Sequence, residues 1–151
     1  MNVSIIGCGY VGIVTAVLLA EYGAHVTCYD ADEEKIKQLQ QGRVFIYESG
    51  LHEKIMCYLG KQLFFTQQRE EAYTKNMIFI TVGTPSLANG MPDTQYLEQV
   101  EQELLTYIHQ DTIIVVKSTV PIGYNDKLQT LVTQKGGRVV SNPEFLREGQ
   151  A

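Results

Sequence analysis

Tryptophan is absent from this chain of 151 residues, and cysteine and basic residues are few. With 12 Lys and Arg against 17 Asp and Glu, the formal net charge is -5, which leaves no broad basic face and argues against nucleic acid as a partner. The three cysteines, Cys8, Cys28 and Cys57, show neither CxxC nor metal-ligand spacing. We therefore predict no disulfide framework and no metal site, and we interpret the thiols as buried or incidental.

A basic leader and a membrane-spanning run are also missing from the sequence pattern. The first apolar stretch, MNVSIIGCGYVGIVTAVLLA, is interrupted by glycines and is too short to cross a bilayer. We interpret it as the start of a folded domain, and we expect a cytoplasmic protein without a membrane partner. Since 44% of the residues are apolar, the chain is long enough for one core but short for two domains.

Short β-branched runs alternate with helical patterns along the whole chain, which is typical of an α/β fold. Strands are predicted at residues 3–6, 25–29, 63–66, 77–82, 112–117 and 138–141. Helices are predicted at residues 11–22, 32–41 and 94–108, with a shorter one around residues 51–59. A further helix is predicted to start at Tyr124 and to bury Leu128, Leu131 and Val132.

Capping residues agree with these limits. Asp32 and Thr94 are predicted N-caps, and the helices are predicted to stop at Gly23, Gly42, Gly60 and Gly136. Strands such as MIFITV and TIIVVK are apolar on both faces, as in a parallel sheet that helices cover on both sides. We therefore predict a doubly wound parallel sheet with the strand order 3-2-1-4-5-6 and a ligand site at the carboxyl ends of the strands.

A glycine-rich loop lies between the first predicted strand and helix. The segment IIGCGYVG places Gly7, Gly9 and Gly12 in G-x-G-x-x-G spacing. The first glycine permits the tight turn, the second lets the backbone approach a pyrophosphate, and the third lets the helix pack close to the strand. The N–H groups of Tyr10 and Val11 would face the phosphates at the positive end of the helix dipole. An acidic chain can bind an anion in this way without a basic side chain.

An acid follows the second predicted strand at the spacing expected for a dinucleotide site. Asp30 lies about 20 residues beyond the last glycine, where its carboxylate can accept hydrogen bonds from the adenosine ribose hydroxyls. The same carboxylate would repel a 2′-phosphate, so we predict a Rossmann-type dinucleotide-binding domain that prefers NAD to NADP. Lys35, one turn into the next helix, either flanks the ribose or is a solvated surface lysine.

Three more loops would open on the same edge of the sheet. The segments TVGTPS, KSTVPIG and SNPEFLREG each carry a proline just past an apolar strand, and rigid turns explain these prolines well. Turns alone explain less well why several polar side chains would converge on one crevice. These are Thr84, Ser118, Thr119, Glu144 and Glu148.

The last segment supports two interpretations. If Asn142 caps a helix with Pro143 at its first position, Glu144 and Glu148 share one face and could divide acid and base duties. A solvated helix start in which Arg147 pairs with Glu144 fits the sequence equally well.

The segments GCGYVG, TVGTP, KSTVPIG and above all NPEFLREG resemble the N-terminal domain of the UDP-glucose/GDP-mannose dehydrogenase family. The similarity runs through the whole chain and includes IYESGL, where Ser49 stands in place of the family's usual proline. The resemblance implies oxidation of the C6 hydroxyl of a nucleotide sugar by two hydride transfers to NAD, through a cysteine-bound thioester. It leans toward UDP-glucose, because members of the N-acetylmannosamine type usually differ at NPEFLREG.

The resemblance also assigns residues to roles. Its cofactor group comprises Gly7, Cys8, Gly9, Tyr10, Val11, Gly12, Asp30, Lys35, Val82, Gly83, Thr84, Pro85, Ser118, Thr119, Val120 and Glu148. In its catalytic group, Thr119 would position a water or polar network, Glu144 would serve acid/base work and thioester hydrolysis, and Glu148 would lie near the nicotinamide ribose. Its sugar-binding group comprises Glu144, Phe145, Leu146, Arg147 and Glu148.

The family has a linker helix and a sugar-nucleotide domain after the segment that ends here at Ala151. Those parts supply its nucleophilic cysteine, and none of the three cysteines here stands at that position. We therefore expect residues 1–151 to be the NAD-binding domain of a longer, dimeric enzyme of polysaccharide biosynthesis, inactive alone and with a bare apolar patch near its C-terminal end. The alternatives are a stand-alone NAD-binding or sensor module, a GDP-mannose 6-dehydrogenase, and another dehydrogenase of the same fold.

Overall fold

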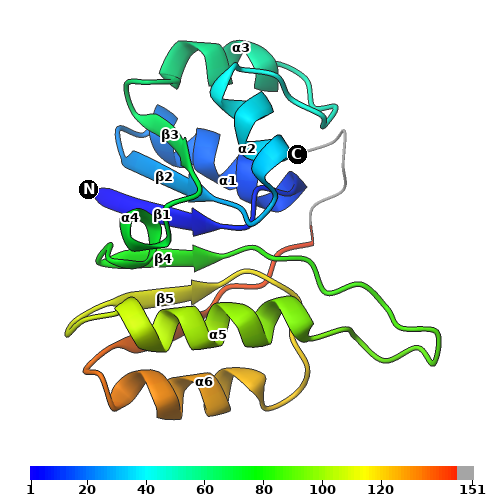
Figure 1. Ribbon diagram of the computed structural model, residues 1–151, viewed down its shortest axis with the longest axis vertical. Helices are drawn as coiled ribbons and strands as arrows, with labels where there is room; N and C mark the ends of the chain where they lie inside the picture. The colour runs from blue at the N-terminus through cyan, green and yellow to red at the C-terminus, as the bar shows by residue number, and fades with distance from the viewer. Residues whose placement is uncertain (146–151) are drawn as a thin grey trace.

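The computed structural model describes residues 1–145 and contains one parallel sheet of six strands with helices on both faces (Figure 1). The strands are β1 (Asn2–Ile6), β2 (His25–Tyr29), β3 (Leu63–Thr66), β4 (Met77–Ile80), β5 (Ile113–Val116) and β6 (Arg138–Ser141). The helices are α1 (Tyr10–Glu21), α2 (Glu33–Gln40), α3 (Leu51–Tyr58), α4 (Arg69–Tyr73), α5 (Gln95–Tyr107) and α6 (Tyr124–Thr133). The order across the sheet is β3-β2-β1-β4-β5-β6, which confirms the predicted doubly wound topology.

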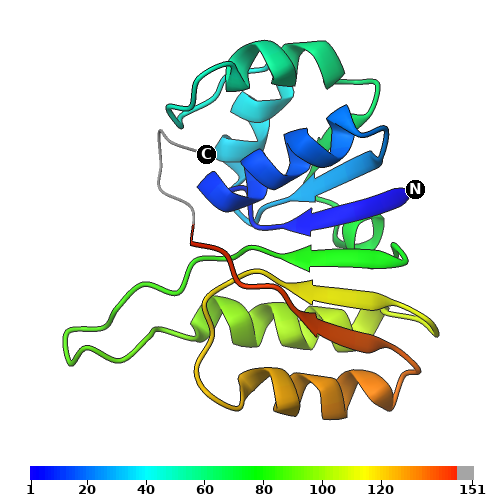
Figure 2. The same ribbon diagram turned by 180° about the vertical axis from the view of Figure 1, so that it is seen from behind.

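The two faces of the sheet carry separate helices and separate halves of the core. Helices α5 and α6 lie in front of the strands in Figure 1, whereas α1 lies in front in the reverse view of Figure 2. Val3 and Ile5 of β1 belong to the apolar cluster under α1, while Ile78 and Ile80 of β4 belong to the cluster under α5 and α6. All four side chains are fully buried, so both faces of the central strands are covered, as their continuous apolar runs predicted.

Most caps follow the predicted chemistry. The carboxylate of Asp32 accepts the N–H of Lys35 at 3.0 Å, as an N-cap should. Thr94 holds the N-cap position of α5, but its hydroxyl bonds Glu98 instead, and the carboxylate of Asp93 accepts the N–H of Gln95 at 3.0 Å. The predicted stops all have positive φ angles, which a helix C-terminus requires: Gly23, Gly42, Gly60 and Gly136.

Several predicted details are wrong for identifiable reasons. Helix α4 was not predicted, because its five residues are too few to show an apolar period. Strand β4 ends at Ile80 rather than at residue 82, since the hydroxyl of Thr81 bonds the glycine loop and the chain then leaves the sheet. Leu131 is half-buried rather than buried, because α6 lies at the β6 edge of the sheet.

The chain after β6 does not begin a helix at Pro143. The N–H of Asn142 donates to the carbonyl of Val116 at 2.9 Å, so the backbone continues beside β5 through the point where a cap was predicted. Residues 142–145 have no helical assignment. An apolar patch was predicted near this end; of the described residues there, Val140 and Phe145 are exposed singly. Within residues 1–145 no helix is long and apolar enough to span a membrane.

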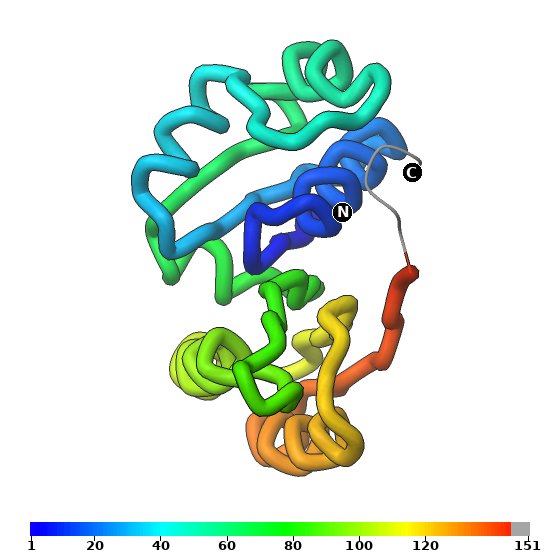
Figure 3. Tube along the Cα trace, turned by 90° about the vertical axis from the view of Figure 1, so that its right-hand side faces the viewer, coloured from blue at the N-terminus to red at the C-terminus, as the bar shows by residue number. Residues whose placement is uncertain are grey.

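The carboxyl ends of the strands face one edge of the molecule. Figure 3 looks onto that edge, where the glycine loop after β1 and the loops after β4 and β5 lie between the two halves of the fold. This is where a doubly wound sheet places its ligand.

Candidate dinucleotide site

The three glycines of the loop differ in what surrounds them. A Cβ on Gly12 would lie 1.9 Å from the carbonyl oxygen of Gly7, so the start of α1 packs on the turn itself. Gly7 has φ +102, and a Cβ there would lie 2.9 Å from the carbonyl oxygen of Thr81. At Gly9 a Cβ would meet no atom within 4 Å. Gly7 and Gly12 therefore serve the packing of the loop, whereas Gly9 leaves open space in which a ligand can approach the backbone.

The first turn of α1 faces this open space without a side-chain cap. Its N-cap is Gly9, which has no side chain to accept from the N–H groups of the first turn. The side chain of Tyr10 is held elsewhere, because its hydroxyl donates to Glu48 at 3.0 Å. The positive end of the helix is thus arranged to receive an anion such as a diphosphate.

Thr81 holds the glycine loop in place through its hydroxyl, and it was not predicted from the sequence. Its buried hydroxyl lies 2.8 Å from the carbonyl oxygen of Gly7 and 3.0 Å from that of Ile6. Thr81 also lines the cavities on both sides of the loop. A threonine within the apolar run MIFITV was the available signal, since a buried hydroxyl needs a nearby acceptor.

Asp30 directly follows β2, and both of its carboxylate oxygens accept hydrogen bonds. Its Oδ2 accepts the N–H of Cys8 at 2.8 Å and lies 2.9 Å from the Lys35 ammonium, while its Oδ1 accepts the N–H of Asp32 at 3.0 Å. The Asp30 side chain is 13% exposed and that of Lys35 is 28% exposed, and both line the larger cavity. Lys35 is thus paired with Asp30 at the wall of the cavity, and its role at the ribose stays a prediction.

The thiols in this region are structural. Cys8 and Cys28 are buried, and Cys57 is exposed on α3. The hydrogen bond with Cys28 and then burial raise the pKa of the Cys8 thiol well above its ordinary value. A neutral buried thiol is a poor nucleophile, so Cys8 contributes to the site only through its backbone N–H.

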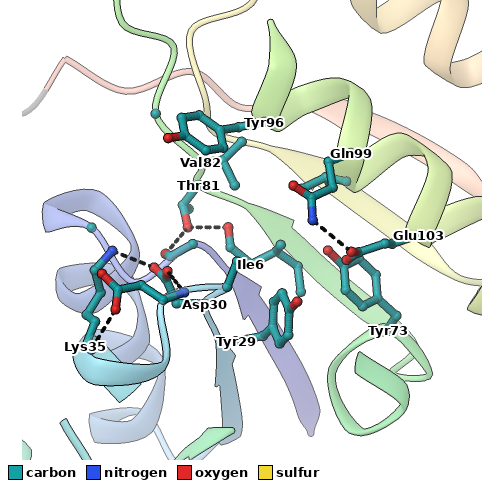
Figure 4. Close-up of a pocket in the computed structure, with 16 residues that line it drawn as sticks. Ile6, Tyr29, Asp30, Lys35, Tyr73, Thr81, Val82, Tyr96, Gln99 and Glu103 are labelled. Carbon is teal, nitrogen blue, oxygen red and sulfur yellow. Dashed lines mark hydrogen bonds and ion pairs between the residues drawn. The ribbon is translucent and has the colours of Figure 1, made fainter. Parts of the chain in front are cut away.

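The larger cavity has a volume of about 500 Å³ and extends from the glycine loop to α5 (Figure 4). Several side chains that line it were not predicted from the sequence as site residues. These are Tyr29, Tyr73, Tyr96, Gln99, Val100 and Glu103. The rings of Tyr29 and Tyr73 meet edge to face with centroids 5.6 Å apart. Burial raises the pKa of both phenols, followed by the charge of Glu103 for Tyr29 and by a hydrogen bond with Glu103 for Tyr73, so both stay neutral.

A second cavity of about 270 Å³ lies on the other side of the glycine loop. It gathers residues predicted for the cofactor together with Glu144, which was predicted for catalysis and sugar binding. The cofactor residues are Gly9, Tyr10, Val11, Val82, Gly83, Thr84, Ser118 and Thr119. Lys117, which was not predicted, also lines it. The hydroxyl of Ser118 donates to the carbonyl of Val82 at 2.7 Å, and that of Thr84 donates to the carbonyl of Thr119 at 2.9 Å. These bonds tie the loops after β4 and β5 together.

Some predicted residues lie outside the two cavities. Pro85 accepts a hydrogen bond from the N–H of Asp93 at 2.7 Å and shapes the loop, and Val120 packs against the core under α6. Phe145 is 94% exposed and lines neither cavity. Leu146, Arg147 and Glu148 lie outside the described residues.

Together, the doubly wound sheet, the glycine loop and the carboxylate after β2 define a dinucleotide-binding domain of the Rossmann type. The model of the UDP-glucose/GDP-mannose dehydrogenase family, NAD binding domain, matches residues 1–151. The chain belongs to this family, and its cofactor is NAD. The residues present fit that group, because Gly9 leaves room at an uncapped helix start and Asp30 reaches the same cavity.

The named relatives of this chain are dehydrogenases that agree with this family assignment. The chain is 40% identical to UDP-glucose 6-dehydrogenase YwqF of Bacillus subtilis. The aligned region covers 100% of this chain and 36% of YwqF. Among solved structures, a UDP-glucose dehydrogenase of Pyrobaculum islandicum has a TM-score of 0.88 at 37% identity, covering 99% of this chain and 37% of that one. GDP-mannose dehydrogenase of Pseudomonas aeruginosa has a TM-score of 0.87 at 34% identity, with coverages of 99% and 37%. The chain therefore spans just over a third of the length of these relatives.

Proposed function

We propose that the chain is the cofactor domain of a nucleotide-sugar 6-dehydrogenase that oxidises UDP-glucose to UDP-glucuronate. The observation that carries the proposal is one cavity that contains both an uncapped helix start and the Asp30 carboxylate. UDP-glucose is favoured as substrate because named UDP-glucose dehydrogenases reach about 40% identity over the whole chain, whereas the GDP-mannose enzyme has 34%. By the family resemblance, the proposal includes a cytoplasmic location, a homodimer at full length and a role in polysaccharide biosynthesis.

In this proposal the larger cavity binds the adenosine half of NAD and the second cavity binds its nicotinamide half. The N–H groups at the start of α1 hold the diphosphate, and Asp30 accepts hydrogen bonds from the ribose hydroxyls. Lys35 neutralises part of the Asp30 charge from 2.9 Å and keeps that carboxylate in place. When bound, NAD supplies the hydride acceptor for both oxidation steps.

The proposed catalytic residues belong to the second cavity. Thr119 and Glu144 line it, and we assign to them the positioning of a water or polar network and the acid/base work. Glu148, which lies outside the described residues, is assigned to the nicotinamide ribose by the family resemblance alone. Because Cys8 and Cys28 are buried and Cys57 lies on a helix that lines neither cavity, the nucleophilic thiol must come from another part of the full-length enzyme.

Calorimetric titration with NAD and with NADP tests the cofactor assignment. We expect the protein to bind NAD more tightly than NADP, because Asp30 repels a 2′-phosphate. Asp30→Ala should weaken NAD binding by about tenfold or more and narrow the gap between the two cofactors. Asp126→Ala, which removes an exposed carboxylate from the first turn of α6, serves as the control. Equal affinity of the unmodified protein for both cofactors would contradict the assignment.

The substrate is tested with the full-length gene product that contains this domain. UDP-glucose, GDP-mannose and UDP-N-acetylmannosamine are offered in turn with NAD, and NADH formation is followed by absorbance. We expect UDP-glucose to be oxidised fastest, with two NADH formed for each sugar. Oxidation of GDP-mannose alone would transfer the assignment to that substrate. NAD binding without oxidation of any sugar would favour the stand-alone NAD-binding module.

A further inference from the structure

The wall of the larger cavity opposite Asp30 carries a further carboxylate. The proposed contacts to the ribose and the diphosphate do not involve it. It belongs to Glu103 on α5, whose side chain is only 13% exposed. Figure 4 shows Glu103 beside Gln99 and above the Tyr73 ring, across the cavity from Asp30 and Lys35. A carboxylate so far withdrawn from solvent needs donors, and its partners show how many of its acceptor positions are used.

Two well-aligned hydrogen bonds to Glu103 come from residues 1–145, and both end on the same oxygen. Its Oε1 lies 2.7 Å from Nε of Arg69 and 3.3 Å from Nε2 of Gln99. The buried hydroxyl of Tyr73 is close enough to share a proton with this carboxylate: burial, then a hydrogen bond with Glu103, then the Glu103 charge raise the pKa of Tyr73. Arg69 therefore fixes the orientation of the carboxylate. Because an ionised carboxylate has about four lone-pair sites, Glu103 keeps acceptor capacity beyond Arg69, Gln99 and Tyr73.

The surroundings of this carboxylate suit a flat aromatic ring. Ile6, Tyr29, Val82 and Val100 line the cavity between Glu103 and Asp30 and offer apolar surface for the faces of a planar base. A ribose held at Asp30 would direct its base into this space. At the edge of such a base, a carboxylate accepts hydrogen bonds from an amino group and repels the lone pairs of a carbonyl oxygen.

We propose that Glu103 accepts a hydrogen bond from the 6-amino group of the adenine of NAD, and so selects a 6-aminopurine over a 6-oxopurine. The inference rests on the proposed placement of NAD and adds the residue that reads the base. Arg69 and Gln99 act as positioning residues, because they hold the Glu103 carboxylate and do not themselves need to touch the base.

The experiment compares NAD with nicotinamide hypoxanthine dinucleotide, which differs by an oxygen in place of the 6-amino group. Calorimetric titration of the protein should give an affinity about ten- to a hundredfold higher for NAD. In Glu103→Gln the ratio should fall to within about threefold, because an amide can donate to the 6-oxygen as well as accept. The matched control is Glu101→Gln, on the same helix, since Glu101 is also little exposed (12%) and pairs with Lys127 at 3.0 Å. That control should keep the ratio of the unmodified protein.

Equal binding of the two dinucleotides by the unmodified protein would overturn the proposal. It would also be overturned if folded Glu103→Gln kept the same ratio of affinities as the unmodified protein. Thermal unfolding checks that the variant is folded. If it is not, Glu103→Asp keeps the charge that Arg69 needs but withdraws the carboxylate by one methylene group, and it should also lower the ratio. Asp30→Ala separates the two proposals: it should weaken both dinucleotides alike and leave the ratio unchanged. A ratio retained while Asp30→Ala changes nothing would contradict the ribose assignment and support the reading of the base by Glu103.

Discussion

The two cavities on either side of the glycine loop are built differently. The larger one is bounded by the ends of β1 and β2, the turns that follow β1, β2 and β4, and the sides of the helices α4 and α5. Its carboxylates at Asp30 and Glu103 are each held by a cation at 2.7 to 2.9 Å. The second cavity is bounded mainly by the loops after β4, β5 and β6, and its hydroxyls at Thr84 and Ser118 are used to tie those loops together.

This difference indicates a division of labour. A site formed by packed elements and paired charges is organised before its ligand arrives, which lowers the entropic cost of binding. A site formed by loops can adjust, and loops commonly carry catalytic residues on a rigid scaffold. We therefore expect the larger cavity to supply most of the affinity for the dinucleotide. ADP-ribose, which lacks the nicotinamide, separates the contributions of the two cavities.

The largest effect is expected from Gly12→Ala, which breaks both cavities at once. The new Cβ would lie 1.9 Å from the carbonyl oxygen of Gly7, so α1 must move off the loop. We expect a loss of about 3 kcal/mol or more in the free energy of unfolding and no measurable NAD binding. Urea unfolding and calorimetry measure the two effects.

Gly9→Ala is the matched control for Gly12→Ala, because a Cβ at Gly9 meets no protein atom within 4 Å. It should keep the stability within about 1 kcal/mol and still lose NAD affinity, since the methyl group projects into the space at the helix start. Normal NAD binding by Gly9→Ala would mean that the diphosphate does not lie there.

A smaller effect is expected from Thr81→Val, at a residue that lines both cavities. The change keeps the shape of the side chain but leaves the carbonyl oxygen of Gly7 without the hydroxyl at 2.8 Å. The free energy of unfolding should fall by about 1 to 3 kcal/mol. NAD and ADP-ribose should lose affinity to the same extent. Thr81→Ser keeps the hydroxyl and should restore most of both quantities, so an equal loss in Thr81→Ser would point to the methyl group instead.

The same contrast shows what the sequence could predict. Strand order and the glycine loop were predictable because they depend on local signals: apolar runs, glycine spacing and an acid directly after β2. The far wall of the larger cavity was not, because Tyr73, Gln99 and Glu103 come from two helices and look like ordinary helical residues until the fold brings them together. The helix expected at Pro143 failed because a backbone bond from Asn142 to Val116, which no local pattern reveals, continues the pairing with β5.

Thr84→Val addresses the second cavity alone. It removes the 2.9 Å bond to the carbonyl of Thr119 and so loosens the link between two loops. Because this bond is exposed, we expect a loss of only about threefold in NAD affinity, with ADP-ribose affinity unchanged. Calorimetry with both ligands measures this, and Thr84→Ser is the control. An equal loss for ADP-ribose would show that the two cavities do not act separately.

The smallest effect is expected far from both cavities, at His109 after α5. Its Nδ1 lies 2.9 Å from the carbonyl oxygen of Gln110 and its Nε2 lies 3.0 Å from that of Thr74. Only the protonated ring can donate to both carbonyls, so these two contacts raise the pKa of His109. A raised folded-state pKa means that the stabilisation is complete below the unfolded-state pKa and is lost as the pH rises through the folded-state value.

Melting temperatures at about pH 5.5 and about pH 8.5 therefore test His109→Gln against the unmodified protein. The variant should be less stable at the lower pH, and the difference should shrink at the higher one. Since His109 is exposed, solvent screening limits the effect to about 0.5 kcal/mol or less. His52→Gln, at an exposed position on α3, controls for the loss of an imidazole. A difference that grew with pH would contradict the assigned donors, and no effect on NAD affinity is expected at either pH because His109 lines neither cavity.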